Sequence, residues 1–132
     1  MRHRQKSLQR LFAVKSQLHR LEEAKLEDIL RKKQVMDEES HALFGLIGDE
    51  QKNDPLLLGL ACRRLKSTDA QRRELERAEQ AQKAVLLMRG AQKKALEKIL
   101  KDNAQAVARD DEKRLLMDIG ESLAARRPSS LP

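Results

Sequence analysis

The side chains most able to do chemistry in this 132-residue sequence are three histidines and one cysteine, and their spacing argues against a reactive site. Metal ligands on a helix stand three or four residues apart. His3, His19 and His41 are much further apart than that, so we expect solvated surface histidines and no bound metal. Cys62 lies among leucines with no His or Asp placed to activate it, so we expect a small core residue rather than a nucleophile.

Two further motifs are explained without catalysis. Gly45 and Gly48 are not followed by the Gly-Lys-Ser/Thr of a phosphate-binding loop, so they indicate a turn. The acidic run at 110–112 lies in a helical pattern, where successive side chains point in different directions, so we expect a solvated face. We find no catalytic constellation and therefore expect a protein that is not an enzyme and needs no cofactor.

The composition is typical of long helices rather than of a globular core. Charged residues make up 37% of the chain, aromatic residues 2%, and the mean hydropathy is −0.72. Bulky aromatic and β-branched side chains are too few to fill a compact α/β or β-sheet core. No stretch approaches the roughly 20 apolar residues that cross a membrane, and no secretory signal is visible. The single cysteine fits a reducing compartment, so we expect a cytoplasmic protein without direct membrane insertion.

Helical spacing predicts a first helix over residues 7–46. Its apolar residues recur every three or four positions, which places them on one stripe of a helix. The stripe consists of Leu8, Leu11, Val14, Leu18, Leu21, Ile29, Met36, Leu43 and Ile47.

A break at 47–55 predicts a turn, followed by a second helix over residues 56–125. Asp54 can accept hydrogen bonds from free backbone N–H groups, and Pro55 suits a first helical turn. The sequence at 67–71 resembles a helix start, which leaves open a kink at 67–69. We expect residues 126–132 to form a loose, disordered tail. The second stripe consists of Leu58, Leu65, Leu75, Ala78, Val85, Leu96, Ile99, Ala106 and Met117.

Two amphipathic helices joined by a tight break predict one all-α unit over residues 1–125, an antiparallel coiled-coil hairpin whose second helix is the longer. In that register Leu43 faces Leu60, Leu18 faces Val85, and Leu8 faces Ala95 or Leu96. The second helix then overhangs the first over residues 103–125. Apolar side chains without a helix opposite them usually mark a partner site.

The turn region carries a dense apolar group around an acidic loop. Its members are Phe44, Leu46, Ile47, Leu56, Leu57, Leu58 and Leu60. One interpretation is a structural cap of the hairpin, and the other is a hydrophobic docking tip. Both remain open, because the two leucine runs supply more apolar surface than one seam can bury.

Charge is segregated along the chain. Residues 1–34 carry +6 and 56–101 carry +7, whereas 35–55 carry −5 and 102–132 carry −1. This pattern indicates an acidic partner along the basic shaft. Nucleic acid is not favoured, because aromatic stacking platforms are absent and Arg and Lys alternate with Glu.

Both ends of the sequence resemble a known family. Residues 7–26, SLQRLFAVKSQLHRLEEAKL, resemble the start of FliJ-type proteins of the bacterial flagellar export apparatus. Those proteins share a two-helix antiparallel coiled coil with the YscO-type proteins of injectisomes. Residues 112–128, EKRLLMDIGESLAARRP, are similar to the charged last helix and basic tail of these proteins.

The resemblance implies a non-enzymatic stalk. It would insert its joined termini into the hexameric export ATPase, promote ring assembly, and link the ATPase through the turn end to the cytoplasmic domain of the export gate. Secretion chaperones are further implied partners, and the protein would lie in the cytoplasm against the inner-membrane export apparatus. The predicted ATPase contacts are Arg4, Arg10, Leu115, Met117, Ile119 and Leu123. The predicted export-gate contacts are Phe44, Leu46, Ile47, Leu56 and Leu57.

Two other classes of function stay open at this point. One is a generic coiled-coil adaptor or homodimer, and the other is a basic helical rod associated with RNA or ribosomes. The sequence does not separate a flagellar from an injectisome system, or a monomer from a dimer.

Overall fold

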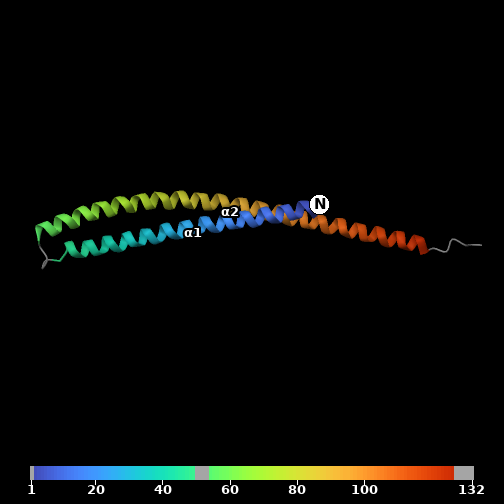
Figure 1. The fold of residues 1–132 in the computed structure, drawn as a ribbon, viewed down its shortest axis with the longest axis horizontal. Coiled ribbons are helices and arrows are strands. Elements are labelled where there is room, and N and C mark those ends of the chain that lie inside the picture. Colours follow the sequence, from blue (N-terminus) through green and yellow to red (C-terminus); the bar gives the residue numbers. More distant parts are fainter. Residues whose placement is uncertain (1, 50–53, 127–132) are drawn as a thin grey trace, which may run out of the picture. The chain divides into compact units, whose positions relative to one another are not determined.

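A computed structural model describes residues 2–49 and 54–126 of the chain, and nearly all of them are helical. Helix α1 spans Arg2–Ile47 and has 46 residues, and helix α2 spans Pro55–Arg126 and has 72 (Figure 1). The described ranges contain no β-strand. The protein is therefore all-helical, and its two helices pack against each other.

Local chemistry sets where α1 ends and α2 begins. After Ile47 the Gly48 amide still donates to the Phe44 carbonyl oxygen at 3.0 Å, which closes the last turn of α1. At the start of α2, the amide of Leu56 donates to a carboxylate oxygen of Asp54 at 3.1 Å. This contact makes Asp54 the N-cap and places Pro55 at the first helical position, where a missing N–H costs nothing.

The chain divides into two compact units, which we describe separately. The turn unit comprises residues 17–91, and the terminal unit comprises residues 1–16 with 92–132. The sequence had predicted one unit over residues 1–125. Each unit contains a segment of α1 and a segment of α2.

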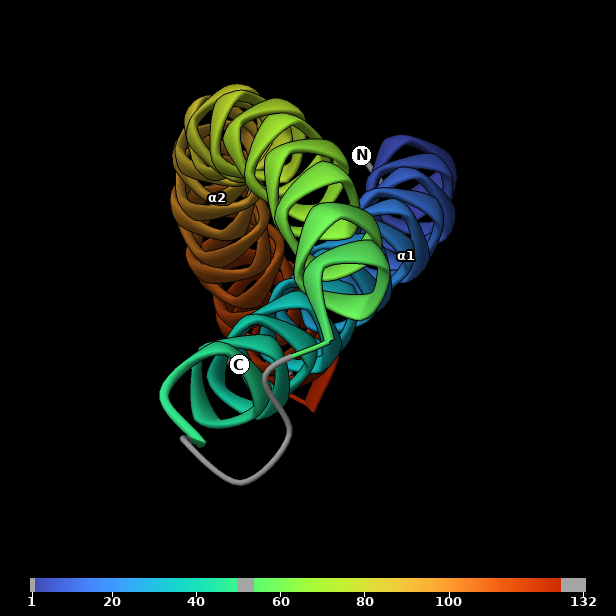
Figure 2. The same ribbon diagram turned by 90° about the vertical axis from the view of Figure 1, so that its left-hand side faces the viewer.

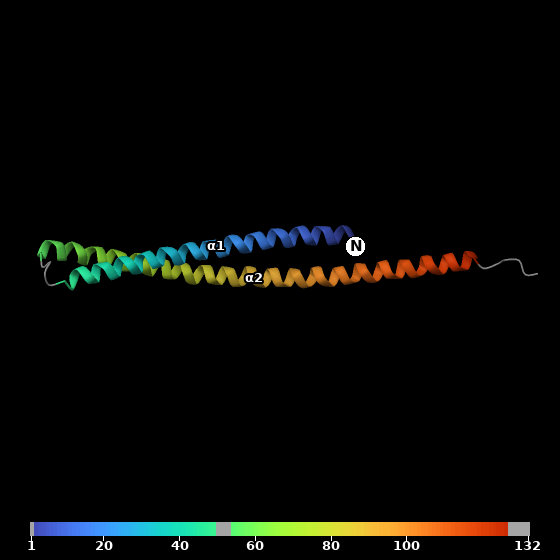
Figure 3. The same ribbon diagram turned by 90° about the horizontal axis from the view of Figure 1, so that it is seen from below.

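In the turn unit the two helical segments lie side by side (Figures 1 and 3). Glu39 of α1 pairs with Arg64 of α2, and further along the backbone carbonyl of Glu22 accepts a hydrogen bond from Gln82 at 3.0 Å. Partner numbers in α2 rise as those in α1 fall, an order consistent with antiparallel pairing.

In the terminal unit the first turns of α1 lie against α2 (Figure 3). The ammonium group of Lys93 lies 5.9 Å from the centre of the Phe12 ring, within the range of a cation–π contact. Leu96 is the most buried apolar side chain here, with 8% of its surface exposed. The Arg2 guanidinium lies 3.0 Å from the Asp111 carboxylate.

The half-buried positions of α1 follow a repeat of three and four residues that matches the predicted stripe at six of its nine positions. The predicted Leu11, Val14 and Leu21 are 46%, 51% and 59% exposed, and that part of the prediction is wrong. Phe12, His19 and neighbouring positions take their place. The half-buried residues of α1 include Leu8, Phe12, Leu18, His19, Glu22, Leu26, Ile29, Lys33, Met36, Leu43, Leu46 and Ile47.

The predicted stripe of α2 is buried or half-buried at seven of its nine positions. Ile99 and Met117 are 47% and 65% exposed, whereas the polar residues Thr68 and Glu79 are buried. The buried and half-buried set includes Leu58, Ala61, Leu65, Thr68, Leu75, Glu79, Gln82, Leu86, Lys93, Leu96, Leu100 and Val107. Polar residues therefore occupy several positions of the contact between the helices.

Helix α2 runs without interruption through residues 67–71, where the sequence resembles a helix start. Thr68 is 1% exposed, and its hydroxyl donates to the Arg64 carbonyl oxygen at 2.8 Å. Bonding to the carbonyl one turn back lets a buried threonine satisfy its hydroxyl inside a helix. Thr68 thus serves as a contact residue within α2.

Candidate partner-binding surfaces

The contact between the start of α1 and α2 ends at Arg2 and Asp111. One Arg2 nitrogen donates to both carboxylate oxygens of Asp111 at 3.0 Å. The two side chains are 74% and 42% exposed, so water screens the pair and it contributes little stability. Its main significance is positional, because it is the last described cross-helix ion pair in the terminal unit.

Every residue of α2 from 112 to 126 is exposed. Figures 1 and 3 show this end of α2 continuing beyond the start of α1. The sequence predicted an overhang over residues 103–125, and the exposed segment is the shorter one that follows Asp111. Among the described residues of the terminal unit, the apolar side chains of this segment are left exposed.

Four apolar side chains of this segment share one face of α2. At about 100° per residue, Leu115, Leu116 and Leu123 all lie within about 60° of Ile119 around the helix axis. We call this set the C-terminal stripe. Its exposed fractions are 60% for Leu115, 61% for Leu116, 48% for Ile119 and 61% for Leu123.

Met117 lies on a different face of α2 from the stripe. It is two residues from Ile119, so the same geometry places it about 160° away around the axis. Leu116, which the predicted ATPase contacts omitted, belongs to the stripe instead. Its spacing of three residues from Ile119 and seven from Leu123 already indicated in the sequence that Leu116 shares their helix face.

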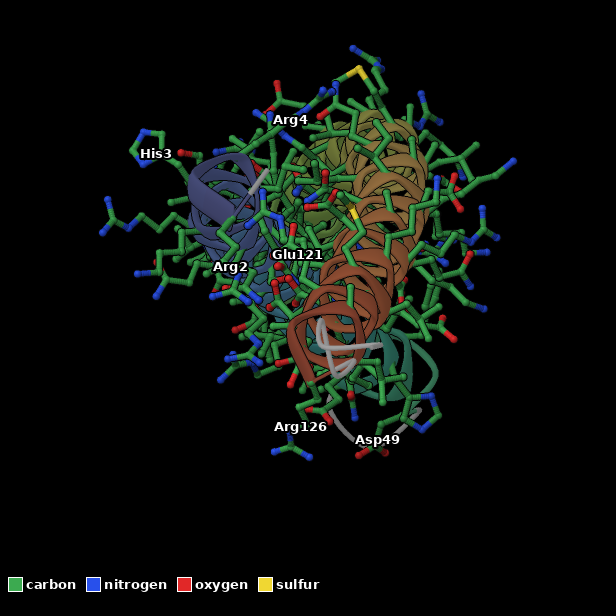
Figure 4. All side chains as sticks on the ribbon, turned by 90° about the vertical axis from the view of Figure 1, so that its right-hand side faces the viewer. Arg2, His3, Arg4, Asp49, Glu121 and Arg126 are labelled. Carbon is green, nitrogen blue, oxygen red and sulfur yellow. The ribbon has the colours of Figure 1, made fainter. Side chains whose placement is uncertain are left out.

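The C-terminal stripe faces away from α1. Relative to Val107, which is on the contacting face, Ile119 lies about 120° around the axis and Leu116 about 180°. Figure 4 shows Glu121 on the side of α2 toward the start of α1, and Arg126 on the side away from it. Arg126 follows Ile119 by seven residues, two helical turns, and so lies on nearly the same face.

Arg4 and Arg10 are exposed on α1, but the structure does not bring them to the stripe. Arg4 is two residues after Arg2, so it lies on the opposite side of α1 from the side chain that meets Asp111. His3 also points away from α2 (Figure 4). Arg10 is eight residues further along α1, away from the exposed end of α2. A partner would have to cover both helices to contact all the predicted residues.

In the turn unit, exposed apolar side chains gather where α1 ends and α2 begins, the end that faces the viewer in Figure 2. Of the predicted contacts, Phe44, Leu56 and Leu57 are 61%, 73% and 38% exposed. Leu46 and Ile47 are half-buried. Residues 50–53 of the predicted turn lie outside the described residues, so the acidic character of this end rests on the sequence.

The residues considered for nucleophilic or metal chemistry are placed differently from expectation. Cys62 is exposed rather than in a core, because its neighbour Ala61, 4% exposed, occupies the contacting position of that turn. His19 is not a solvated histidine: 18% of its side chain is exposed, and its Nδ1 lies 2.7 Å from a Glu23 carboxylate oxygen. Within residues 2–49 and 54–126, no group of three metal-binding side chains comes together.

A polar cluster in the turn unit was not predicted from the sequence. The Glu79 carboxylate lies 2.8 Å from the ammonium group of Lys33 and 3.1 Å from that of Lys83. The hydrogen bond from Lys33, followed by that from Lys83, holds the pKa of Glu79 below its ordinary value. The hydrogen bond from Gln82 likewise lowers the pKa of Glu22. No local motif signals these contacts, because Lys33 and Glu79 are 46 residues apart.

No protein family, curated protein or solved structure that was compared with this chain matches it. Neither helix, over its described residues, combines the length and apolar character that crossing a membrane requires. The functional assignment therefore depends on the exposed surfaces and on the sequence resemblance.

Proposed function

We propose that this chain is a non-enzymatic stalk or adaptor of a bacterial flagellar or type III protein export apparatus. In this proposal the two helices form an antiparallel coiled-coil hairpin with the longer second helix extending past the first. The terminal end inserts into the export ATPase hexamer and promotes its assembly. The turn end contacts the cytoplasmic domain of the export gate, at the inner membrane.

The C-terminal stripe is the observation that carries the proposal. Its four apolar side chains are about half exposed or more, whereas Leu96, earlier in α2, is 8% exposed. An exposed helix face that alternates with charged residues is a typical docking element for another protein. The resemblance of residues 7–26 and 112–128 to FliJ-type and YscO-type proteins supports an export ATPase as that protein.

The test is the ATP hydrolysis rate of the export ATPase from the same organism, titrated with this protein. We expect stimulation together with increased hexamer formation, and loss of both when residues 112–132 are deleted. Ile119→Asp should abolish the stimulation, because it places a charge in the middle of the stripe. Ala124→Asp introduces the same charge about 140° away around α2 and serves as the matched control.

Both variants change exposed positions, so circular dichroism should show unchanged helix content. A flat titration with fully helical protein would contradict the proposal and favour a coiled-coil adaptor of another system. Equal loss in the two aspartate variants would contradict the assignment of the stripe as the docking face.

The turn end is tested separately. Leu56 is the most exposed of its apolar side chains, at 73%. Leu56→Asp should weaken binding to the cytoplasmic domain of the export gate and leave stimulation of the ATPase unchanged. If this variant binds the export gate as tightly as the unaltered chain, the apolar group at the turn is a structural cap and not a docking surface.

A further inference from the structure

One face of the exposed end of α2 carries an order of charged and apolar residues that is complementary to the same order read in the opposite chain direction. Glu112, Leu116, Ile119, Leu123 and Arg126 follow one another in steps of four, three, four and three. These steps give the 3.5-residue repeat that keeps one helix face against a second helix. From either direction, this face presents a charged residue, three apolar residues and a residue of the opposite charge.

The described residues of the terminal unit bury none of these five positions. All are exposed, and the apolar three are 61%, 48% and 61% exposed in chain order. Neither Glu112 nor Arg126 has an ion-pair partner among the described residues, whereas the nearby Asp111 and Arg114 are paired with Arg2 and Asp110. The side chains needed for an intermolecular contact are therefore free.

We propose that this face binds a second copy of the chain, with the two α2 ends antiparallel and related by a two-fold axis at Ile119. In this pairing Leu116, Ile119 and Leu123 of one copy pack between those of the other, centred on Ile119. Glu112 of one copy meets Arg126 of the other, and the symmetry provides each of these contacts twice.

Charge decides between the two orientations that two identical helices can adopt. A parallel pairing in register places Glu112 against Glu112 and Arg126 against Arg126, so that like charges meet at both ends of the stripe. The antiparallel pairing places opposite charges at both ends. Charged residues that flank an apolar seam set partner orientation in coiled coils in this way.

The contact is short, so the dimer is a weak one. Three apolar residues per helix bury less than the roughly 800 Å² per partner of a standard stable interface. We expect dissociation in the range of about 10⁻⁵ to 10⁻⁴ M, typical of a transient association. The stripe has room for one occupant, so the dimer and an ATPase-bound form would exclude each other.

The test uses the isolated chain, so it is independent of whether the export ATPase is a partner. Sedimentation equilibrium from about 10 μM to 1 mM should show a reversible monomer–dimer association of the unaltered chain. Glu112→Arg and Arg126→Glu should each weaken the dimer about tenfold, because both replace two attractive pairs by two repulsive ones. The double variant Glu112→Arg/Arg126→Glu should return to within about twofold of the unaltered chain.

A matched control has the same charge change on another face. Glu121→Arg lies on the side of α2 toward α1 and should leave the dimer unchanged (Figure 4). Ile119→Asp, on the two-fold axis, should leave only monomer. The proposal is overturned if the unaltered chain stays monomeric at every concentration. It is equally overturned if the double variant is no tighter than the single variants, because a parallel dimer or another interface has no reason to be rescued.

Discussion

The Glu79 carboxylate lies 2.8 Å from the Lys33 ammonium group in the contact between α1 and α2, with only 8% of the Glu79 side chain exposed. Lys83, one turn further along α2, approaches the same carboxylate from the other side at 3.1 Å. Apolar side chains tolerate sliding of one helix along the other, whereas a buried ion pair is satisfied in one register only. We infer that this pair fixes the register of the turn unit.

Removing one partner of this pair should destabilise the protein. Glu79→Leu leaves the ammonium group of Lys33 half-buried without its carboxylate, and we expect the thermal midpoint to fall by about 5 °C. The double variant Lys33→Met/Glu79→Leu should recover most of the loss, because two apolar side chains replace two charges. Thermal unfolding followed by circular dichroism measures both.

The exposed pair of Arg73 and Asp69 provides the control, since its side chains are 71% and 52% exposed. Asp69→Ala should change the midpoint by no more than about 1–2 °C. A double variant that is no more stable than Glu79→Leu would show that the loss comes from packing and not from the unpaired ammonium group.

Stability should fall on the acid side through Glu79 and Glu22. Their pKa values are both lowered in the folded protein from an ordinary 4.5. A carboxyl with a lowered pKa contributes stability that is fully present above its unfolded pKa and is lost as the pH falls through its folded pKa. The pKa of Lys33 is raised above 10.5, chiefly by its hydrogen bond to Glu79, so Lys33 itself stays protonated throughout the acid range and the loss there comes from the carboxylates.

Urea unfolding midpoints between pH 7 and about pH 3 measure this effect. Glu79→Gln should be less stable than the unaltered chain at pH 7, and the difference should shrink as the pH falls below about 4.5. A difference that stays constant down to pH 3 would mean that the ionisation of Glu79 does not contribute to stability.

At Thr68 we expect shape to matter more than the hydroxyl. The residue is 1% exposed, and its hydroxyl bonds only to a carbonyl of its own helix. Thr68→Val keeps the volume and should change the free energy of unfolding by less than about 1 kcal/mol. Thr68→Ala opens a cavity and should cost about 1 kcal/mol or more. If the valine variant is the less stable of the two by urea denaturation, the hydroxyl and not the packing is what the site requires.

Gly90→Ala should stabilise the turn unit. A Cβ atom at this position would lie 3.6 Å from His19 Nε2, an ordinary van der Waals distance. Alanine is better than glycine inside a helix by about 1 kcal/mol, and we expect a gain of that size in the free energy of unfolding. Gly90→Leu should instead displace His19 and lose stability. Urea denaturation of both variants separates the effect of helix propensity at position 90 from the effect of steric crowding against His19. Destabilisation by Gly90→Ala would refute the expectation.

Local features of the sequence were sufficient to predict most of the helical structure. The Asp54-Pro55 pair specifies the start of α2 through one hydrogen bond and one fixed dihedral angle, both within three residues. The C-terminal stripe is equally local, because Leu115, Ile119 and Leu123 recur every four residues on any helix that contains them. Whether such a stripe stays exposed depends on where the partner helix starts.

Choosing the contacting face required the other helix. The stripe containing Leu11, Val14 and Leu21 and the stripe containing Phe12 and His19 are adjacent on α1, and both recur every three or four residues. Apolar content alone favours the first. Between residues 11 and 22 the structure buries mainly the second stripe, and α2 supplies partners for its polar members, including Gln82 for Glu22.

The sequence by itself thus determined two long helices, the cap that starts the second one, and a chain rich in charge with few residues for a core. These properties follow from interactions between residues that are at most four positions apart, so they do not depend on the rest of the fold. Only the tertiary structure decided that Glu79 is buried and Lys33 half-buried while Leu21 is exposed. The free energy of burying the Glu79 charge depends on Lys33, which is 46 residues away in the chain. The packing of the two helices, and not the spacing of residues in the sequence, brings the two side chains together.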